Sequence, residues 1–280
     1  MITKNQVKAL FNPRNLLPPI IFILKEKIIS FFIKKNILDP WIDKPVNYKK
    51  MDRLFKDKVV LNGPFIGMKY PKLESNGSSL YPKLLGSYEK EIQYLIYKLI
   101  NNNYSKVVDI GSAEGYYAVG FALKSPKSII MAFDSDSVAL ENCKNMAKQN
   151  HVLDRVQLSS WCSKEILLKE DLKNSLIISD CEGYEKELFL DNDIVKHLKD
   201  TTLLIETHDH VDINISNKLK SYFSNSHKVE SIYSLDDFSK LKNYEFSCLK
   251  DFDLRTKKEI IFEGRGYIQE WLILYPKQSN

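Results

Sequence analysis

The stretch "VVDIGSAEGYYAVGFA", from Val107 to Ala122, joins a short apolar run that ends in an acid to two glycines and a segment of helical character. A buried strand that turns through glycines into a helix is typical of the first strand–turn–helix unit of ligand-binding α/β proteins. In these proteins the ligand lies at the carboxyl end of the strand, beside the turn. The stretch therefore predicts an α/β fold and the place of its ligand.

Strand-like and helix-like segments alternate around this stretch. A helical pattern covers 87–100, and the segments between the first five strand candidates also read largely as helices. This alternation predicts a doubly wound, Rossmann-like α/β sheet of seven strands with helices on both faces, in which a long final hairpin adds antiparallel edge strands. The strand candidates are 106–110, 128–133, 155–159, 175–180, 201–206, 227–233 and 269–275.

The first 85 residues differ from the rest of the chain. Prolines and glycines punctuate 36–80, and a hairpin is expected within "VVLNGPFIGMKY", residues 59–70. We therefore expect two parts: an N-terminal extension over 1–85, acting as a collar or lid, and a main domain over 86–280.

The most apolar region of the chain is residues 16–35. The charged residues Lys25, Glu26 and Lys27 interrupt it before it reaches the roughly 20 residues needed to span a bilayer. Its apolar residues recur at helical spacing, which predicts an amphipathic helix. Two roles stay open for this helix: packing on the main domain or on a second subunit of a homodimer, or peripheral contact with a membrane surface.

Composition excludes several classes of protein. The 280 residues include 41 basic and 36 acidic ones, and the excess of +5 is scattered along the chain. No basic stripe is visible, so a nucleic-acid partner is not expected. The four cysteines form no C-x-x-C pair and no metal-finger spacing, which favours reduced thiols in a cytoplasmic protein.

The turn does not fit a phosphate ligand. The nicotinamide fingerprint G-x-G-x-x-G has Ala113 in place of its second glycine here, and Glu114 would put a negative charge where a pyrophosphate arrives. The Gly-Lys-Ser/Thr of a P-loop is also absent from the turn. These departures favour a nucleoside ligand without phosphates, such as S-adenosylmethionine.

Acids at the expected strand ends suit S-adenosylmethionine. Asp109 can face the ammonium group, Gly111 lets the chain turn beneath the methionine portion, and Asp134 can accept hydrogen bonds from the ribose hydroxyls, with Asp136 as the weaker substitute. The loop with Ser160 is expected to border the adenine. The candidate cofactor residues are Asp109, Gly111, Ser112, Gly115, Asp134, Ser135, Trp161, Cys162 and Asp180.

Four segments carry a family resemblance: "VVDIGSAEGYYAVGFA", "AFDSDSVALENCKNMA", "IISDCEGYEKELF" and "LLIETH". They resemble the successive motifs of the FkbM-like branch of class I methyltransferases, over about residues 105 to 210. The resemblance implies a class I methyltransferase sheet and an S-adenosylmethionine-dependent methyltransferase that most often acts on oxygen. The sequence departs from the usual G-x-G-x-G of methyltransferases at Ala113.

Two acids and a histidine are candidates for the chemistry. Asp180 and Glu206 end strands expected to be neighbours, and His208 follows Glu206 closely. Two carboxylates and an imidazole in one cleft repel unless a cation or a proton lies between them. A Mg²⁺ or Mn²⁺ ion held by Asp180, Glu206 and His208 would resolve this conflict, as in enzymes that resemble catechol O-methyltransferase, whereas His208 as a general base needs no metal. Both alternatives stay open.

Two flanking segments could complete the pocket. Tyr88 and Glu89 are expected over the mouth of the cofactor site. Arg265 could hold an acidic group of the acceptor or lie on the surface in a glycine-bounded turn. The sequence as a whole predicts an O-methyltransferase of a small molecule, a sugar or a glycan precursor. The rival hypotheses are a non-catalytic adenosine-binding subunit of the same fold and a nicotinamide-dependent oxidoreductase.

Overall fold

The computed structural model describes residues 46–277, which group into two compact units. The sheet unit comprises Asp57–Tyr244 together with the residues from Ile261 onward, and the small unit combines residues 46–56 with Glu245–Ile260. The amphipathic helix predicted at 16–35 lies outside the described residues. Within 46–277, no helix has both the length and the apolar character needed to cross a membrane.

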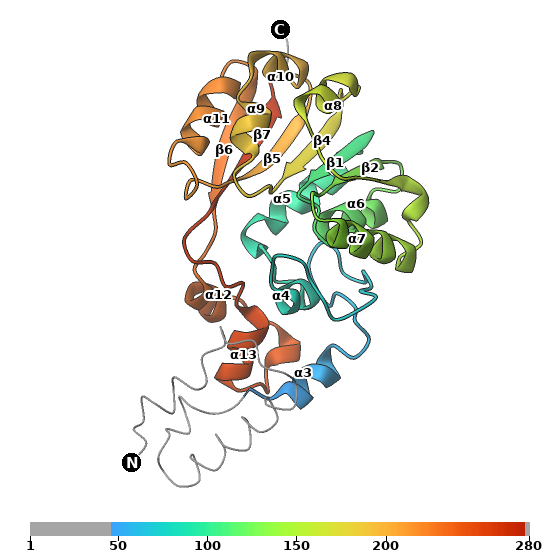
Figure 1. Cartoon of the computed structure of the whole chain (residues 1–280). Coiled ribbons are helices and arrows are strands. Elements are labelled where there is room, and N and C mark those ends of the chain that lie inside the picture. The colour runs from blue at the N-terminus through green and yellow to red at the C-terminus, as the bar shows by residue number, and fades with distance from the viewer. Residues whose placement is uncertain (1–45, 278–280) are drawn as a thin grey trace, which may run out of the picture. The chain divides into compact units, whose positions relative to one another are not determined.

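A seven-stranded sheet forms the centre of the sheet unit, with the strand order β3-β2-β1-β4-β5-β7-β6 (Figure 1). The first five strands of that order are parallel, and β7 runs antiparallel to both of its neighbours. This confirms the doubly wound sheet of class I methyltransferases. The strands are β1 (Lys106–Ile110), β2 (Ile129–Phe133), β3 (Val156–Ser159), β4 (Ser175–Ser179), β5 (Thr202–Thr207), β6 (His227–Tyr233) and β7 (Glu270–Pro276).

Helices cover both faces of the sheet. The central strands β4 and β5 are buried along their whole length, as expected for parallel strands with a helix layer on each side. Alternate strand residues such as Val108, Ile177 and Leu203 join one apolar cluster with the helices of the second half of the chain. These helices are α8 (Lys164–Lys169), α9 (Glu185–Phe189), α10 (Asn192–His197) and α11 (Ile215–Phe223).

The opposite face carries the helices of the first half of the chain. In α5, Ile92, Leu95, Ile96 and Leu99 lie on one helical face and are buried, which explains the predicted periodicity over 87–100. The helix α6 packs against β1 and β2 and against its neighbour α7. These helices are α5 (Lys90–Asn101), α6 (Tyr116–Lys124) and α7 (Ser137–Gln149).

One detail of the predicted topology is wrong. The last two strands pair antiparallel as expected, but β7 inserts between β5 and β6, so that of these two strands only β6 lies at an edge of the sheet. Four consecutive residues of β7, Trp271, Leu272, Ile273 and Leu274, are almost completely buried. A strand this apolar on both faces is stabilised by an interior position.

The sheet unit begins at Asp57, before the boundary expected at residue 86. The expected hairpin forms through an antiparallel bridge between Val59 and Lys69. Phe65 from this hairpin packs edge-on against Tyr116 and Phe121 of α6, with ring centroids 5.2 and 5.7 Å away. This packing and α4 (Leu80–Leu85) join the segment to the sheet.

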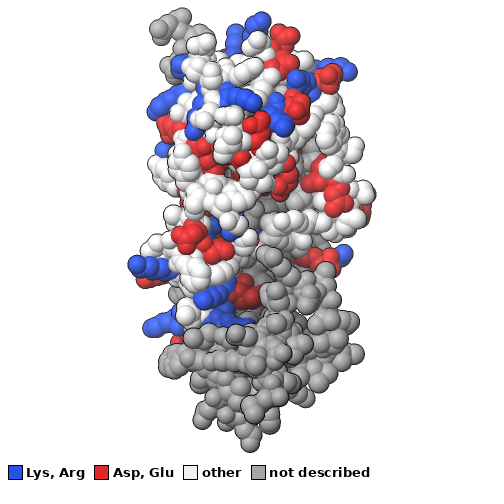
Figure 2. Space-filling model, turned by 60° about the vertical axis from the view of Figure 1, so that its left-hand side comes forward, with Lys and Arg blue, Asp and Glu red and all other residues white. Residues whose placement is uncertain are grey.

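The remaining described elements are short. In the small unit, Asn47 accepts a hydrogen bond from the backbone of Lys50 and so caps α3 (Tyr48–Leu54). Two further helices, α12 (Asp237–Asn243) and α13 (Leu254–Ile261), lie in the connection from β6 to β7. On the face of the sheet unit that Figure 2 shows, basic and acidic side chains are interspersed.

Candidate active site

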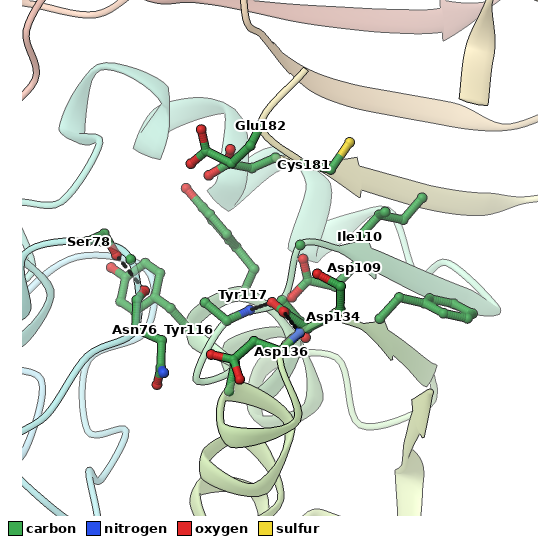
Figure 3. A pocket seen from close by; sticks show the side chains of 18 of the residues that line it. Asn76, Ser78, Asp109, Ile110, Tyr116, Tyr117, Asp134, Asp136, Cys181 and Glu182 are labelled. Atoms are coloured by element: carbon green, nitrogen blue, oxygen red, sulfur yellow. Dashed lines mark hydrogen bonds between the residues drawn. The ribbon is translucent and has the colours of Figure 1, made fainter. Parts of the chain in front are cut away.

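A cavity of about 330 Å³ opens at the carboxyl ends of β1, β2 and β4, beside the glycine turn. This is where an open α/β sheet binds its ligand, because the chain leaves the central strands in opposite directions there. Figure 3 shows Asp109, Asp134 and Asp136 on one side of the cavity and Glu182 facing them across it. Of the predicted cofactor residues, the cavity is lined by Asp109, Gly111, Ser112, Asp134, Ser135, Trp161, Cys162 and Asp180.

The backbone of β4 determines the shape of the turn at Gly111. Gly111 has a φ of +85°, and a Cβ atom added to it would lie 1.7 Å from the carbonyl oxygen of Asp180. The amides of Gly111 and Ser112 both donate to the carbonyl of Phe133, which fixes the turn to β2. The approach of the segment after β4 to the turn therefore already requires glycine here, and Gly111 also lines the cavity, as expected of a residue beneath the methionine portion.

Gly115 serves the packing of the helix that begins there, and its role as a cofactor contact stays a prediction. It lies outside the lining of the cavity, and its φ is +95°. A Cβ atom at this position would lie 2.7 Å from the sulfur of Cys143 in α7. Glycine thus lets α6 begin close to α7.

Glu114 does not face the cavity, so its charge is not the reason that a pyrophosphate would fail to bind. Its carboxylate is buried and pairs with the ammonium group of Lys83 at 2.6 Å. It also accepts hydrogen bonds from Ser75 and from the backbone of Asn76. Burial alone would raise the pKa of Glu114, but the charge and hydrogen bond of Lys83 lower it below its usual value. The sequence could not show this pair, because Lys83 lies 31 residues away.

A phosphate ligand is disfavoured instead by the backbone amide of Ala113, which already has a partner. Its backbone amide donates to the Oδ2 of Asp134 at 2.7 Å, while the other oxygen of Asp134 accepts from the amide of Asp136 at 2.8 Å. An amide that already donates to a carboxylate is not free to bind a phosphate. Asp136 accepts from the amide of Val138 and caps α7, so Asp134 is the better placed of the two acids for a ribose.

Asp109 is a buried acid with one oxygen atom free. Only 3% of the residue is exposed, and its Oδ2 has no hydrogen-bond partner among the described residues. Burial raises its pKa to about 7, against the opposing effect of a hydrogen bond from the backbone of Ala118. An unpaired carboxylate oxygen at a cavity is a site for a cationic group.

Aromatic side chains border the far end of the cavity. The ring of Trp161 is half exposed and lies 4.7 Å from the ring of Tyr184, measured between centroids. Cys162 beside it is buried in the apolar cluster of the sheet. Together they offer a flat, apolar surface of the kind that an adenine ring packs against.

His208 lies between acids at the ends of β4 and β5. Its Nδ1 is 2.9 Å from the Oε1 of Glu185, and its Nε2 is 3.4 Å from the Oδ1 of Asp180. Burial alone would lower the pKa of His208, but its hydrogen bonds to Asp180 and Glu185 and their charges raise it to about 11. A protonated imidazole has no lone pair, so the arrangement does not support His208 as a general base.

Asp180, which lines the cavity, keeps a pKa below its usual value because the hydrogen bond and charge of His208 outweigh its burial.

Glu206, at the end of β5, pairs with Arg265. The Arg265 guanidinium donates to Glu206, Glu89 and Glu263, and only 12% of its side chain is exposed. Arg265 therefore does not lie on the surface, which corrects that alternative, and three of its five N–H groups already donate to acids of the chain. Burial raises the pKa of Glu206 well above its usual value, with repulsion from Asp180 and Glu89 adding to the effect.

The predicted repulsion between acids is thus relieved by side chains of the chain itself. Arg265 supplies the positive charge beside Glu206, and His208 supplies it beside Asp180. In the part of the chain that the structure describes, the ligand atoms close enough to share one ion form two sets, Asp180–Glu182–His208 and Glu89–Asp180–Glu206. The predicted set of Asp180, Glu206 and His208 is not one of them.

Comparisons with known proteins add the following. No family profile matches the chain. A bifunctional methyltransferase of Rickettsia felis is 32% identical over 63 residues, which are 22% of this chain and 12% of that protein, so the chain covers only a small part of its relative's length. The precorrin-6y C5,15-methyltransferase of Geobacter metallireducens is 13% identical with a TM-score of 0.44, over 66% of this chain and 89% of that one. The O-methyltransferase TomG of Streptomyces achromogenes, solved with S-adenosylmethionine, is 12% identical with a TM-score of 0.45, over 69% and 82%.

Proposed function

We propose that the chain is an S-adenosylmethionine-dependent methyltransferase that acts on a hydroxyl group of a small molecule, a sugar or a glycan precursor. The observation that carries this proposal is the unpaired oxygen of Asp109 in a cavity whose other charged groups are mainly acids. Among residues 46–277, Lys83 is the one lysine or arginine that lines the cavity, and it is bound to Glu114. Such a lining suits a cofactor with an ammonium and a sulfonium group and does not suit a pyrophosphate.

Each part of the cofactor then has a partner. Asp109 pairs with the ammonium group, and Asp134 accepts from the ribose hydroxyls with the lone pairs that its two amide donors leave free. The adenine packs against Trp161 and Cys162, and Ser112 has a buried hydroxyl without a partner among the described residues, available to the methionine portion. These contacts leave the sulfonium near Asp180, at the carboxyl end of β4.

Asp180 is the residue that we assign to the acceptor. Methyl transfer from a sulfonium is an in-line displacement, in which the acceptor oxygen attacks the methyl carbon while the carbon–sulfur bond breaks. A charged carboxylate beside the oxygen accepts a hydrogen bond from the hydroxyl and stabilises the positive charge that develops on the oxygen. As the new oxygen–carbon bond forms, the hydroxyl proton passes to this carboxylate and then to solvent, and the sulfur keeps the electron pair of the broken carbon–sulfur bond. His208 and Glu185 keep Asp180 charged and in place.

The proposal predicts transfer of the methyl group to oxygen. We expect the protein, given S-adenosylmethionine with an isotopically labelled methyl group and a panel of monosaccharides, glycosides and phenols, to release S-adenosylhomocysteine and to place the label on a hydroxyl oxygen. Asp180→Asn should reduce the rate roughly 100-fold or more, the range for loss of a positioned acid–base group. Mass spectrometry of the products measures both. Bound S-adenosylhomocysteine without transfer to any member of a broad panel would favour the non-catalytic subunit, and oxidation of a panel member by NAD would favour the oxidoreductase.

A further inference from the structure

Glu182 is an acid of the cavity to which the proposed function gives no partner. It lines the cavity, its side chain is 82% exposed, and it faces the acids of the cofactor side across the space (Figure 3). Its φ of +56° lies in the left-handed region, which glycine and asparagine adopt more readily than glutamate does. A residue that keeps an unfavourable backbone conformation beside a ligand cavity is often one with a role in binding.

The charges around Glu182 leave a negative excess. The imidazolium of His208 faces it, with Nε2 3.7 Å from the carboxylate. The same ring also contacts Asp180 at 3.4 Å and Glu185 at 2.9 Å, so three carboxylates share one positive charge. Among residues 46–277, no lysine or arginine forms an ion pair with any of these three acids. A ligand that brings a positive charge to this end of the cavity is therefore favoured over a neutral or an anionic one.

Two aromatic rings lie beside this end of the cavity. The ring of His210 is 5.6 Å from that of His208, and the ring of Tyr267 is 4.7 Å from that of His210, measured between centroids. The hydroxyl of Tyr267 is hydrogen-bonded to Nδ1 of His210, and its ring is largely exposed. Partial burial raises the pKa of Tyr267, and the charge of the neighbouring Glu182 raises it further. An aromatic ring beside a carboxylate is a surface that attracts organic cations.

The spacing of the two acids that line this end narrows the class of ligand. Oxygen atoms of Asp180 and Glu182 lie within 4.8 Å of one another. A hydroxyl and an ammonium group on neighbouring carbon atoms can span this separation, each through a charge-assisted hydrogen bond of about 2.7 Å.

We propose that the acceptor is an amino alcohol of this kind, such as a 2-amino-2-deoxy sugar. Its hydroxyl donates to Asp180, its ammonium group pairs with Glu182, and its carbon skeleton packs beside Tyr267. Glu182 is then the residue that selects the acceptor by its charge. That this ligand is the methyl acceptor rests on the proposed function, whereas the preference for an ammonium group does not.

Three probes with the same ring test the preference: trans-2-aminocyclohexanol, trans-cyclohexane-1,2-diol and trans-2-hydroxycyclohexanecarboxylate. Saturation-transfer NMR titrations of the full chain at pH 7, with EDTA to keep divalent ions from the acids, measure their affinities. We expect the amino alcohol to bind about tenfold or more tightly than the diol, because it adds a charge-assisted hydrogen bond, and the carboxylate not to bind. D-glucosamine should exceed D-glucose in the same way.

Variants of Glu182 should change this order. Glu182→Gln should lower the affinity for the amino alcohol to that for the diol, and Glu182→Lys should make the carboxylate the preferred probe. The side chain is exposed, so both variants are expected to fold normally. Tyr267→Leu should weaken binding of the amino alcohol about two- to fivefold, the range for a cation over an exposed ring. Glu187→Gln, which changes an exposed acid of α9 outside the lining of the cavity, is the matched control and should bind as the wild type does.

Three results would overturn the inference: no binding of either aminated probe, a diol that binds as tightly as the amino alcohol, or an unchanged preference in Glu182→Gln. Titrations of the same sample with S-adenosylhomocysteine separate the inference from the proposed function. Binding of the nucleoside without a preference for the amino alcohol refutes only the acceptor class. A preference for the amino alcohol without binding of the nucleoside refutes only the cofactor assignment.

Discussion

Replacing Gly111 with alanine is expected to destabilise the sheet unit by about 3 kcal/mol or more, within the range of the most damaging single substitutions. The added Cβ would lie 1.7 Å from the carbonyl oxygen and 2.7 Å from the carbonyl carbon of Asp180. These are backbone atoms of the segment after β4, which pairs with β1 along its whole length, so they can move only if the centre of the sheet opens. Urea denaturation followed by circular dichroism measures the loss.

Gly67→Ala is the matched control for this effect. Gly67 has a φ of +90°, but a Cβ atom there would have no neighbour within 4 Å. Its variant carries only the cost of the left-handed conformation, about 1 to 2 kcal/mol. If both variants unfold at the same urea concentration, then the close approach of β4 to the turn is not what requires glycine at 111.

Replacing Arg265 with methionine should cost about 3 to 5 kcal/mol at pH 8, because buried carboxylates lose their cation. Glu89, Glu206 and Glu263 all pair with this guanidinium and are at most 2% exposed at their side chains. Burial raises the pKa of Glu89 to about 7 even though Arg265 opposes it, and the pKa of Glu206 is also raised. Without Arg265 both values rise further.

This loss should depend on pH in a defined direction. An acid whose pKa is higher in the folded than in the unfolded protein binds more protons when folded, so stability falls as the pH rises between the two values. The variant should therefore recover stability between pH 8 and pH 5.5. Arg155→Met is the control, because Arg155 donates to the carbonyls of Ala122, Ser125 and Ser128, which do not titrate. An equal loss for Arg265→Met at both pH values would contradict the account of these carboxylates.

The strands could be predicted because their signal is local. Short apolar runs such as Leu176 to Ile178 are buried by helices on both sides, and each observed strand begins and ends within one residue of its predicted bounds. The order of the last two strands has one local signal, the four consecutive apolar residues from Trp271 to Leu274, which favour an interior position for β7.

More of the residues that line the cavity could be predicted than of the ion pairs beside it. Asp109 is the last residue but one of β1 and Asp134 directly follows β2, so their place could be predicted from the strands themselves. Arg265 lies 176 residues from Glu89 and 59 from Glu206, and no spacing rule connects them. Glu185 begins α9, where an acid favours the helix dipole whether or not it has another partner. Its contact with His208 comes from the adjacency of β4 and β5.

The central claim is that the cavity binds an S-adenosyl cofactor with its ammonium group against Asp109, and calorimetric titration with S-adenosylhomocysteine tests it most directly. The cofactor pairs with the charged form of Asp109, whose pKa is about 7 in the free protein. The affinity for S-adenosylhomocysteine should therefore fall about tenfold from pH 8 to pH 6. At pH 6, binding should also release a proton from Asp109 to the buffer. The Asp109→Asn variant should bind S-adenosylhomocysteine weakly at both pH values, without this pH dependence. NAD should not bind to the wild-type protein. A protein that binds NAD but not S-adenosylhomocysteine, or an Asp109→Asn variant with wild-type affinity and pH dependence, would contradict the account.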